Sequence, residues 1–172
     1  MIPVTDFVIE PRAYTDADVA RLVAEVQQEY VQRYGGPDSA AVDPREFEPP
    51  EGLFLVGLLA GVPVATGGWR RLDAPGYDPA SDAEIKRMYV SARARRRGLA
   101  RLMLAELERS AALAGLERLV LNTGPQQPEA VALYTGAGYD VVPGFGYYVR
   151  YPDALFYGKK LAVTDGEPIS RG

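Results

Sequence analysis

The sequence predicts a mixed α/β fold in which helices flank a mostly antiparallel sheet of about seven strands. Apolar runs at residues 53–61 and 62–72 are separated by a short turn, which indicates an antiparallel hairpin. A strand, a helix and a second strand follow in order within residues 83–123, the pattern of a right-handed parallel crossover. Antiparallel and parallel connections therefore meet in one mixed sheet.

Length and composition limit the class of protein. At 172 residues, the chain suits one domain, residues 1–172, and is too short for two ordinary ones. No apolar run approaches the roughly 20 residues that cross a bilayer, and residues 1–12 lack the features of a secretory signal. We expect a cytoplasmic protein with no membrane partner. The net charge of −4 argues against a nucleic acid as partner.

Missing residue types narrow the chemistry. The chain has no histidine and no cysteine, which excludes a Ser-His-Asp triad, a cysteine nucleophile and a thiolate or imidazole zinc site. We expect no metal, and acid–base work falls to Glu, Asp, Tyr or Lys. No GxxxxGK[ST] loop is present, and the glycine pairs in GAGYD and GFGYY lack the third glycine and the helix of a dinucleotide site.

The first elements are an edge strand and a helix. Residues 7–12 alternate in polarity like a strand, and Thr15 is expected to begin a helix that runs to about Tyr34. Its apolar stripe consists of Val19, Leu22, Val23, Val26 and Tyr30. Residues 35–52 are rich in Gly, Pro and acidic residues, which predicts a long loop with one short helical turn. Loops of this length are often functional.

The middle of the chain is expected to form the centre of the sheet. The hairpin turns at residues 60–61, and the glycines at 67–68 indicate a bulge. Residues 83–90 alternate as a strand, and apolar spacing predicts a helix from about Leu99 to Ala114. Gly115 would then end this helix as its C-cap.

The last third is expected to complete the sheet. Residues 116–123 form a buried strand, and residues 127–138 form a short helix ended by glycine. Residues 139–161 predict two terminal strands around an aromatic loop. The tail, residues 162–172, is expected to be frayed.

Three consecutive arginines and a glycine stand directly before the second long helix, in RRRGLA at residues 95–100. Basic residues are unfavourable at a helix N-terminus unless something anionic offsets them. The small residues Gly98 and Ala100 let a phosphate approach the N–H groups of the helix start. The segment therefore predicts a phosphate site, and its alternative is a basic helix end exposed to solvent.

The strand, the segment Arg95-x-x-Gly98-x-Ala100 and the apolar helix resemble, in this order, the acyl-CoA-binding core of the GNAT N-acetyltransferase superfamily, whose pattern is [RQ]-x-x-G-x-[GA]. Downstream, QPEAVALYTGAGY is similar to the family's N-x-x-A-x-x-L-Y helix, so the resemblance covers about residues 83–140. It implies a sheet splayed at the cofactor strand and a small stand-alone bacterial acyltransferase (EC 2.3.1.-). Such an enzyme transfers acetyl from acetyl-CoA to the amine of a small molecule or peptide N-terminus by direct attack in a ternary complex. The alternative is an acyl-CoA-binding regulatory module without turnover.

The same resemblance implies the cofactor contacts. The pyrophosphate of coenzyme A would lie across residues 95–100, and its pantetheine would pair with the strand backbone at residues 88–90. The expected contacts are Met88, Tyr89, Val90, Arg95, Arg96, Arg97, Gly98, Leu99, Ala100, Asn122, Thr123, Gln127, Ala130 and Tyr134. Gln127 replaces the usual asparagine and lengthens the reach of the amide. A polar turn is the alternative for Thr123.

The resemblance also implies two catalytic candidates. Glu84 aligns with a carboxylate that some members use as a base, and it could act through a water; its alternative is an exposed glutamate at the start of a strand. Asp82 and Glu29 are the reserves. Tyr134 would protonate or hydrogen-bond the departing thiolate, and its alternative is a buried aromatic residue.

The acceptor amine should be bound by the first helix, the loop at 35–52 and the aromatic loop at 143–152. We expect Tyr30, Tyr34 and Tyr147 to contact it. The acidic side chains of Glu46, Glu48 and Glu51 could attract a cation, which favours a small amine or an exposed N-terminus over an anionic acceptor. The identity of the amine and a possible homodimer are left open by the sequence.

Overall fold

The computed structural model describes residues 4–162, so the rest of the predicted frayed tail lies outside the described residues. The strands are β1 (Phe7–Pro11), β2 (Gly52–Leu59), β3 (Val62–Arg71), β4 (Asp82–Val90), β5 (Arg118–Thr123), β6 (Asp140–Val141) and β7 (Leu155–Lys160). The helices are α1 (Ala17–Tyr34), α2 (Leu99–Leu113) and α3 (Pro128–Gly136), and the short 3₁₀ turns are η1 (Val4–Asp6), η2 (Pro44–Phe47), η3 (Ala92–Ala94) and η4 (Tyr147–Arg150).

The strands form one sheet in the order β1-β2-β3-β4-β5-β7-β6. β4 and β5 pair in parallel across the α2 crossover, and every other pair of neighbours within residues 4–162 is antiparallel. The predicted mixed, mostly antiparallel sheet is therefore confirmed. None of the helices in the same part of the chain is long and apolar enough to cross a membrane.

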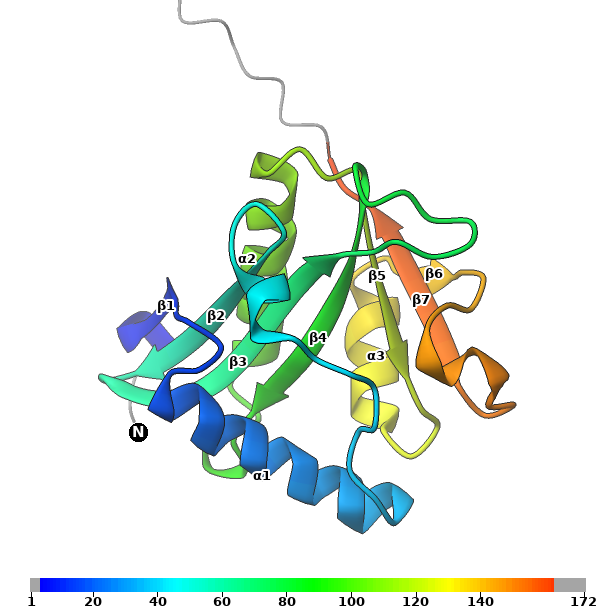
Figure 1. The fold of residues 1–172 in the computed structure, drawn as a ribbon. Helices are drawn as coiled ribbons and strands as arrows, with labels where there is room; N and C mark the ends of the chain where they lie inside the picture. The colour runs from blue at the N-terminus through cyan, green and yellow to red at the C-terminus, as the bar shows by residue number, and fades with distance from the viewer. Residues whose placement is uncertain (1–3, 163–172) are drawn as a thin grey trace, which may run out of the picture.

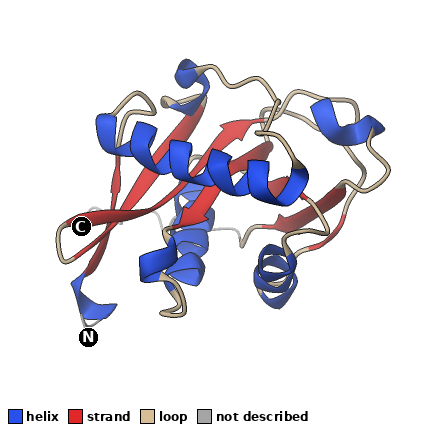
Figure 2. Cartoon of the chain, turned by 90° about the horizontal axis from the view of Figure 1, so that it is seen from below, coloured by secondary structure: helices blue, strands red, loops and turns tan. Residues whose placement is uncertain are grey.

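Helices cover both faces of the sheet. α1 lies across one face, while α2 and α3 lie on the other (Figures 1 and 2). The apolar stripe of α1 buries Val19, Leu22 and Val26, and α2 buries Met103 and Leu107 in the main core. The helical spacing of these residues thus sets which face of each helix meets the sheet.

α1 begins two residues later than predicted because Asp16, and not Thr15, caps it. The Asp16 carboxylate accepts a hydrogen bond of 2.8 Å from the backbone N–H of Asp18. At the other end, Gly35 has a φ of 79° and its N–H donates to the Val31 carbonyl. A carboxylate cap and a left-handed glycine are the usual ends of a stable helix.

β4 and β5 separate along their length. Three residue pairs join them, the last being Glu84 with Val120, and beyond this point the strands diverge (Figure 1). β4 also has a bulge opposite Gly67, where Arg87 has a φ of 57° and its carbonyl accepts a 2.7 Å hydrogen bond from Thr66 Oγ1. The bulge predicted at residues 67–68 is confirmed, with the extra residue in β4. The divergence leaves one edge of β4 open.

Candidate active site

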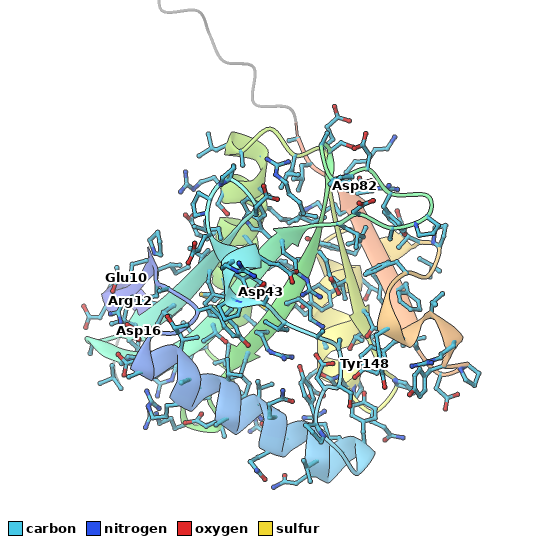
Figure 3. The ribbon with its side chains drawn as sticks, viewed as in Figure 1. Glu10, Arg12, Asp16, Asp43, Asp82 and Tyr148 are labelled. Atoms are coloured by element: carbon cyan, nitrogen blue, oxygen red, sulfur yellow. The ribbon has the colours of Figure 1, made fainter. Side chains whose placement is uncertain are left out.

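A cavity of about 390 Å³ lies where β4 and β5 diverge. It is lined by the end of α1, the loop at residues 36–39, the middle of β4, the end of β5 and the aromatic segment around η4. Figure 3 shows Tyr148 from that segment close to this open side of the sheet, whereas Asp82 lies at the far end of the strands. A cavity of this size suits a small molecule.

The start of α2 presents backbone N–H groups that no described side chain caps. Its N-cap, Gly98, has a φ of 76°, Arg96 has a φ of 64°, and no side chain of the described residues caps the helix. The first turn contains no acidic residue. Left-handed residues beside a helix start direct several backbone N–H groups into one concavity, and the helix dipole adds positive potential there. The segment fits the predicted pyrophosphate, whose contacts with Arg97, Leu99 and Ala100 stay predictions.

The Arg95 side chain points away from that concavity. Its guanidinium forms an ion pair with Glu29 of α1, and its Nε donates to the Val90 carbonyl at 2.9 Å. The same group lies 5.7 Å from the centre of the Tyr89 ring. In this conformation Arg95 joins α1 to the end of β4, and a phosphate contact would come from its backbone neighbours.

The predicted pantetheine edge is the open edge of β4. Met88 packs against the main core, and Tyr89 is buried with its hydroxyl 3.1 Å from Glu25. Burial, reinforced by that hydrogen bond, raises the pKa of Tyr89 to about 12. Because these side chains are fixed on the two faces of the sheet, the β4 backbone beyond Glu84 is left to face the gap toward β5.

The end of β5 forms the opposite wall. Asn122 and Thr123 line the cavity, and Thr123 pairs with Leu155 inside the sheet. Thr123 is thus the last residue of a strand, so its alternative as part of a polar turn is wrong. The Asn122 amide donates to the Leu155 carbonyl at 3.3 Å.

The start of α3 closes the cavity against α1. Gln127 is the N-cap residue of α3, and its amide donates to the Tyr34 hydroxyl at 3.2 Å. Arg33 reaches across to the Gln126 carbonyl at 2.8 Å. Ala130 packs against the main core, so a cofactor contact by its side chain stays a prediction.

Tyr134 combines a packed ring with an available hydroxyl. The residue is 5% exposed, and its ring meets that of Tyr139 edge-on, with the centroids 5.5 Å apart. Its hydroxyl has no hydrogen bond to another described residue, yet every fully enclosed polar side-chain atom in this part of the chain has a partner. The hydroxyl therefore borders accessible space. Burial, and then the nearby Tyr30 hydroxyl, raises its pKa, so the phenol keeps its proton at neutral pH.

The three carboxylates considered as bases each face an arginine. Glu84 is 7% exposed, which makes its alternative as an exposed strand-start residue wrong, and Arg70 Nε lies 3.2 Å from its Oε2. Asp82 receives two hydrogen bonds of 2.8 Å from Arg118. The third carboxylate, Glu29 of α1, forms an ion pair with Arg95. Since Glu84 does not line the cavity, its role as base stays a prediction.

A charged cluster that the sequence analysis missed stands in the cavity wall. Asp38 Oδ2 lies 3.0 Å from Lys86 Nζ and 2.6 Å from an Nη of Arg87. Asp38 Oδ1 accepts from the Tyr148 hydroxyl at 2.7 Å and from the Ala40 N–H at 2.9 Å. Burial opposes the charge on Asp38, but Lys86, the Ala40 N–H, Tyr148 and Arg87 together hold its pKa well below the usual range.

One feature of the sequence indicates the two basic residues of this cluster. From residue 83, apolar and polar residues alternate up to Lys86, and the alternation breaks at Arg87, the second of two adjacent basic residues. A break in a period of two indicates a bulge that turns neighbouring side chains to one face. Asp38 and Tyr148 lie in irregular segments and left no comparable pattern.

Of the residues expected to bind the acceptor, the tyrosines line the cavity and the glutamates do not. Tyr30, Tyr34 and Tyr147 all line the cavity, and burial raises the pKa of Tyr30 to about 12. The acidic side chains do not line it: Glu46 pairs with Arg70 at 2.9 Å, and the others, Glu48 and Glu51, are also absent from the wall. The expected attraction of a cation by these glutamates therefore has no basis in the cavity.

Comparison with known proteins agrees with this geometry. The model of the acetyltransferase (GNAT) family matches residues 20–139. An IAA acetyltransferase of Azospirillum brasilense is 32% identical over 143 residues, which are 83% of this chain and 90% of that protein. A solved acyl-CoA N-acyltransferase structure from Klebsiella pneumoniae has a TM-score of 0.71 at 28% identity, over 91% of this chain and 98% of that one. A GNAT structure from Elizabethkingia anophelis with acetyl-CoA bound shares the fold, with a TM-score of 0.63 at 14% identity, over 91% of this chain and 99% of that one.

Proposed function

The chain belongs to the GNAT acetyltransferase family, and on this premise we propose that it transfers the acetyl group of acetyl-CoA to the amine of a small molecule or a peptide N-terminus. The observation that carries the proposal is the divergence of β4 and β5: the middle of β4 lines a cavity of about 390 Å³, and the end of β4 leads through η3 to the uncapped start of α2. A long, anionic thioester and a small amine could meet in such an opening. The activity named for the Azospirillum relative supports acetyl transfer as the reaction class.

The residues that would hold acetyl-CoA are those of two backbone segments. The start of α2, at residues 95–100, offers N–H groups to the pyrophosphate, and the open edge of β4, at residues 88–90, offers peptide groups to the pantetheine. Acetyl-CoA supplies an activated acyl group as a thioester. Asn122, Thr123 and Gln127 lie on the other side of the gap and support the same placement.

Tyr134 holds the proton that the reaction needs. Its phenol is protonated at neutral pH, borders accessible space and is positioned by the packing of its ring. A positioned acid of this kind contributes about 10²–10⁴-fold to a rate. The nearby carboxylates are held by arginines, so a base role for Glu84 would require a bridging water.

A thiol-release assay tests the proposal. Purified protein with acetyl-CoA and a broad panel of primary amines should release coenzyme A with at least one amine, and the product should carry one acetyl group by mass spectrometry. Calorimetry with acetyl-CoA alone measures binding independently. Binding without any thiol release would support a regulatory acyl-CoA-binding module instead, while the absence of both would contradict the cofactor site.

A further inference from the structure

Two neighbouring cations of β4 face the same way. Consecutive residues of a strand normally point to opposite faces of a sheet. The left-handed conformation of Arg87, with a φ of 57°, breaks this alternation, so Lys86 and Arg87 both reach Asp38 Oδ2. Their side chains are 9% and 5% exposed, and both residues line the cavity. The bulge therefore concentrates two positive charges in one wall.

Asp38 balances only one of these charges, and its oxygens are fully engaged. Oδ2 receives Lys86 and Arg87, while Oδ1 receives the Tyr148 hydroxyl and the Ala40 N–H. A carboxylate offers about four acceptor positions, so little capacity remains to bind an incoming ammonium group. Asp38 thus orients the two cations and is a poor anchor for a positively charged ligand.

Two other acidic groups near the wall lie outside its enclosed part. Glu84 Oε1 lies 3.9 Å from Lys86 Nζ, but its second oxygen is paired with Arg70, and Glu84 does not line the cavity. Asp153 lines the cavity from an exposed loop position, where solvent screens its charge. Glu84 and Glu46 both pair with Arg70 and do not line the cavity, so the enclosed part of its lining has two cations, Lys86 and Arg87, and one anion, Asp38.

Lys86 and Arg87 also have N–H groups available to a ligand. Lys86 has three N–H donors and, among residues 4–162, one partner within hydrogen-bond distance, Asp38. Arg87 uses its Nε toward the Tyr14 hydroxyl, at 3.4 Å, and one Nη toward Asp38, so part of its planar fork is left over. Arginine and lysine N–H groups in a buried wall match the oxygens of a carboxylate.

We infer that the acceptor is an amine that also carries a carboxylate, and that Lys86 and Arg87 bind this carboxylate. The tyrosines of the cavity, among them Tyr30, Tyr34 and Tyr148, would then contact an apolar or aromatic body between the two groups. This inference rests on the proposed function and reverses the expectation of a cation-attracting acceptor site. It makes Lys86 and Arg87 specificity-determining residues.

Matched amines test the inference on the unmodified protein. We would compare 3- and 4-(aminomethyl)benzoate with their carboxamides, since the ring separates the two groups and leaves the paired amines with similar pKa values. The carboxylates should have a kcat/KM about tenfold to a hundredfold higher, as one charge-assisted contact predicts, mainly through a lower KM. Equal values for the members of both pairs would overturn the inference while acetyl transfer itself stood.

A second experiment needs no acetyl transfer. With coenzyme A present, titration calorimetry should detect benzoate or phenylacetate binding but not their amides. The variant Lys86→Gln should lose this binding, while Lys159→Gln should keep it, because Lys159 pairs with Glu108 on a different part of the sheet. Melting curves and acetyl-CoA binding would verify that both variants fold. Equal binding of acids and amides, or unchanged binding in Lys86→Gln, would contradict the assignment.

Discussion

The two halves of the candidate site differ in the groups that form them: backbone groups form one half, and side chains form the other. The start of α2 is formed by the backbone of consecutive residues, with Gly98 and Arg96 in left-handed conformations and no side-chain cap in the described structure. The opposite wall is formed by side chains from separate parts of the chain, Asp38 with Lys86 and Tyr148. The first half should thus respond to changes of backbone shape, and the second to changes of charge.

The difference also has an energetic side. The backbone half carries its positive potential in N–H groups that water can solvate when no ligand is bound. In the side-chain half, Asp38, Lys86 and Arg87 are mostly buried and depend on one another. Removing one buried partner leaves the others without compensation, so this half links ligand recognition to stability.

The largest effect is expected at Tyr134, the proposed acid. Tyr134→Phe removes one oxygen and keeps the ring, so kcat should fall by about 10²–10⁴-fold while acetyl-CoA affinity changes little. Stopped-flow and steady-state kinetics with an accepted amine measure this. Tyr139→Phe is the matched control, because its hydroxyl contacts Glu108 and its ring is the neighbour of Tyr134. Full turnover in Tyr134→Phe, with chemistry rate-limiting, would remove Tyr134 as the acid.

Asp38→Asn should break the side-chain half. It leaves Lys86 and Arg87 buried without their counterion, and such losses cost about 3–5 kcal/mol of unfolding free energy. Urea unfolding at neutral pH, monitored by circular dichroism, measures the cost. Acetyl-CoA binding by the folded fraction should be retained, since the α2 start is not involved.

The pH dependence of the unfolding free energy tests the contribution of Asp38 further. The pKa of Asp38 is depressed in the folded protein, so its stabilisation is fully present above the unfolded value of about 3.9. It is lost as the pH falls below that value and through the folded pKa, because the unfolded state then binds the proton more readily. Unfolding free energy should therefore fall less steeply below about pH 4 in Asp38→Asn than in the unmodified protein. Parallel acid limbs would show that Asp38 does not contribute.

Substitutions at two glycines distinguish the effect of backbone strain from the effect of a lost ligand contact. Gly98 and Gly115, at the two ends of α2, have φ values of 76° and 84°, and an added Cβ meets no atom within 4 Å at either position. Valine at either site should cost about 1–2 kcal/mol of stability. Only Gly98→Val should also weaken acetyl-CoA binding, by about tenfold to a hundredfold through lost phosphate contact, as measured by calorimetry. Equal affinities in both variants would place the phosphate elsewhere.

The smallest effect concerns a helix start that is not a site. Asp16 lies at the beginning of α1, close to Arg12 (Figure 3), and its carboxylate fills the position that an anion would take. Asp16→Ala should lower the unfolding free energy by about 1 kcal/mol and leave acetyl-CoA affinity unchanged. Thermal melts and calorimetry on one preparation measure both. A change in affinity would show that the two helix starts are coupled.

The same division explains what could be predicted from the sequence. The hairpin, the crossover and the start of α2 depend on neighbouring residues, so periodicity and the segment at 95–100 were sufficient to predict them. The start of α1 was predicted two residues too early, because the cap of a helix depends on a single hydrogen bond. The Asp38 cluster requires three-dimensional contact between residues about 50 and 110 positions apart, which no local pattern contains.

Two opposing effects on stability meet at Arg87: the strain of its left-handed backbone and the contacts of its side chain. A side chain with a Cβ is strained there by about 1–2 kcal/mol, and glycine would relieve the strain. Glycine would also remove the buried contacts of the Arg87 side chain with Asp38 and Tyr14, whose loss outweighs the strain, so laboratory evolution for heat resistance should keep the arginine. Residue 87 is thus a position where stability and the acetylation of a carboxylate-bearing amine favour the same side chain, despite its strained backbone.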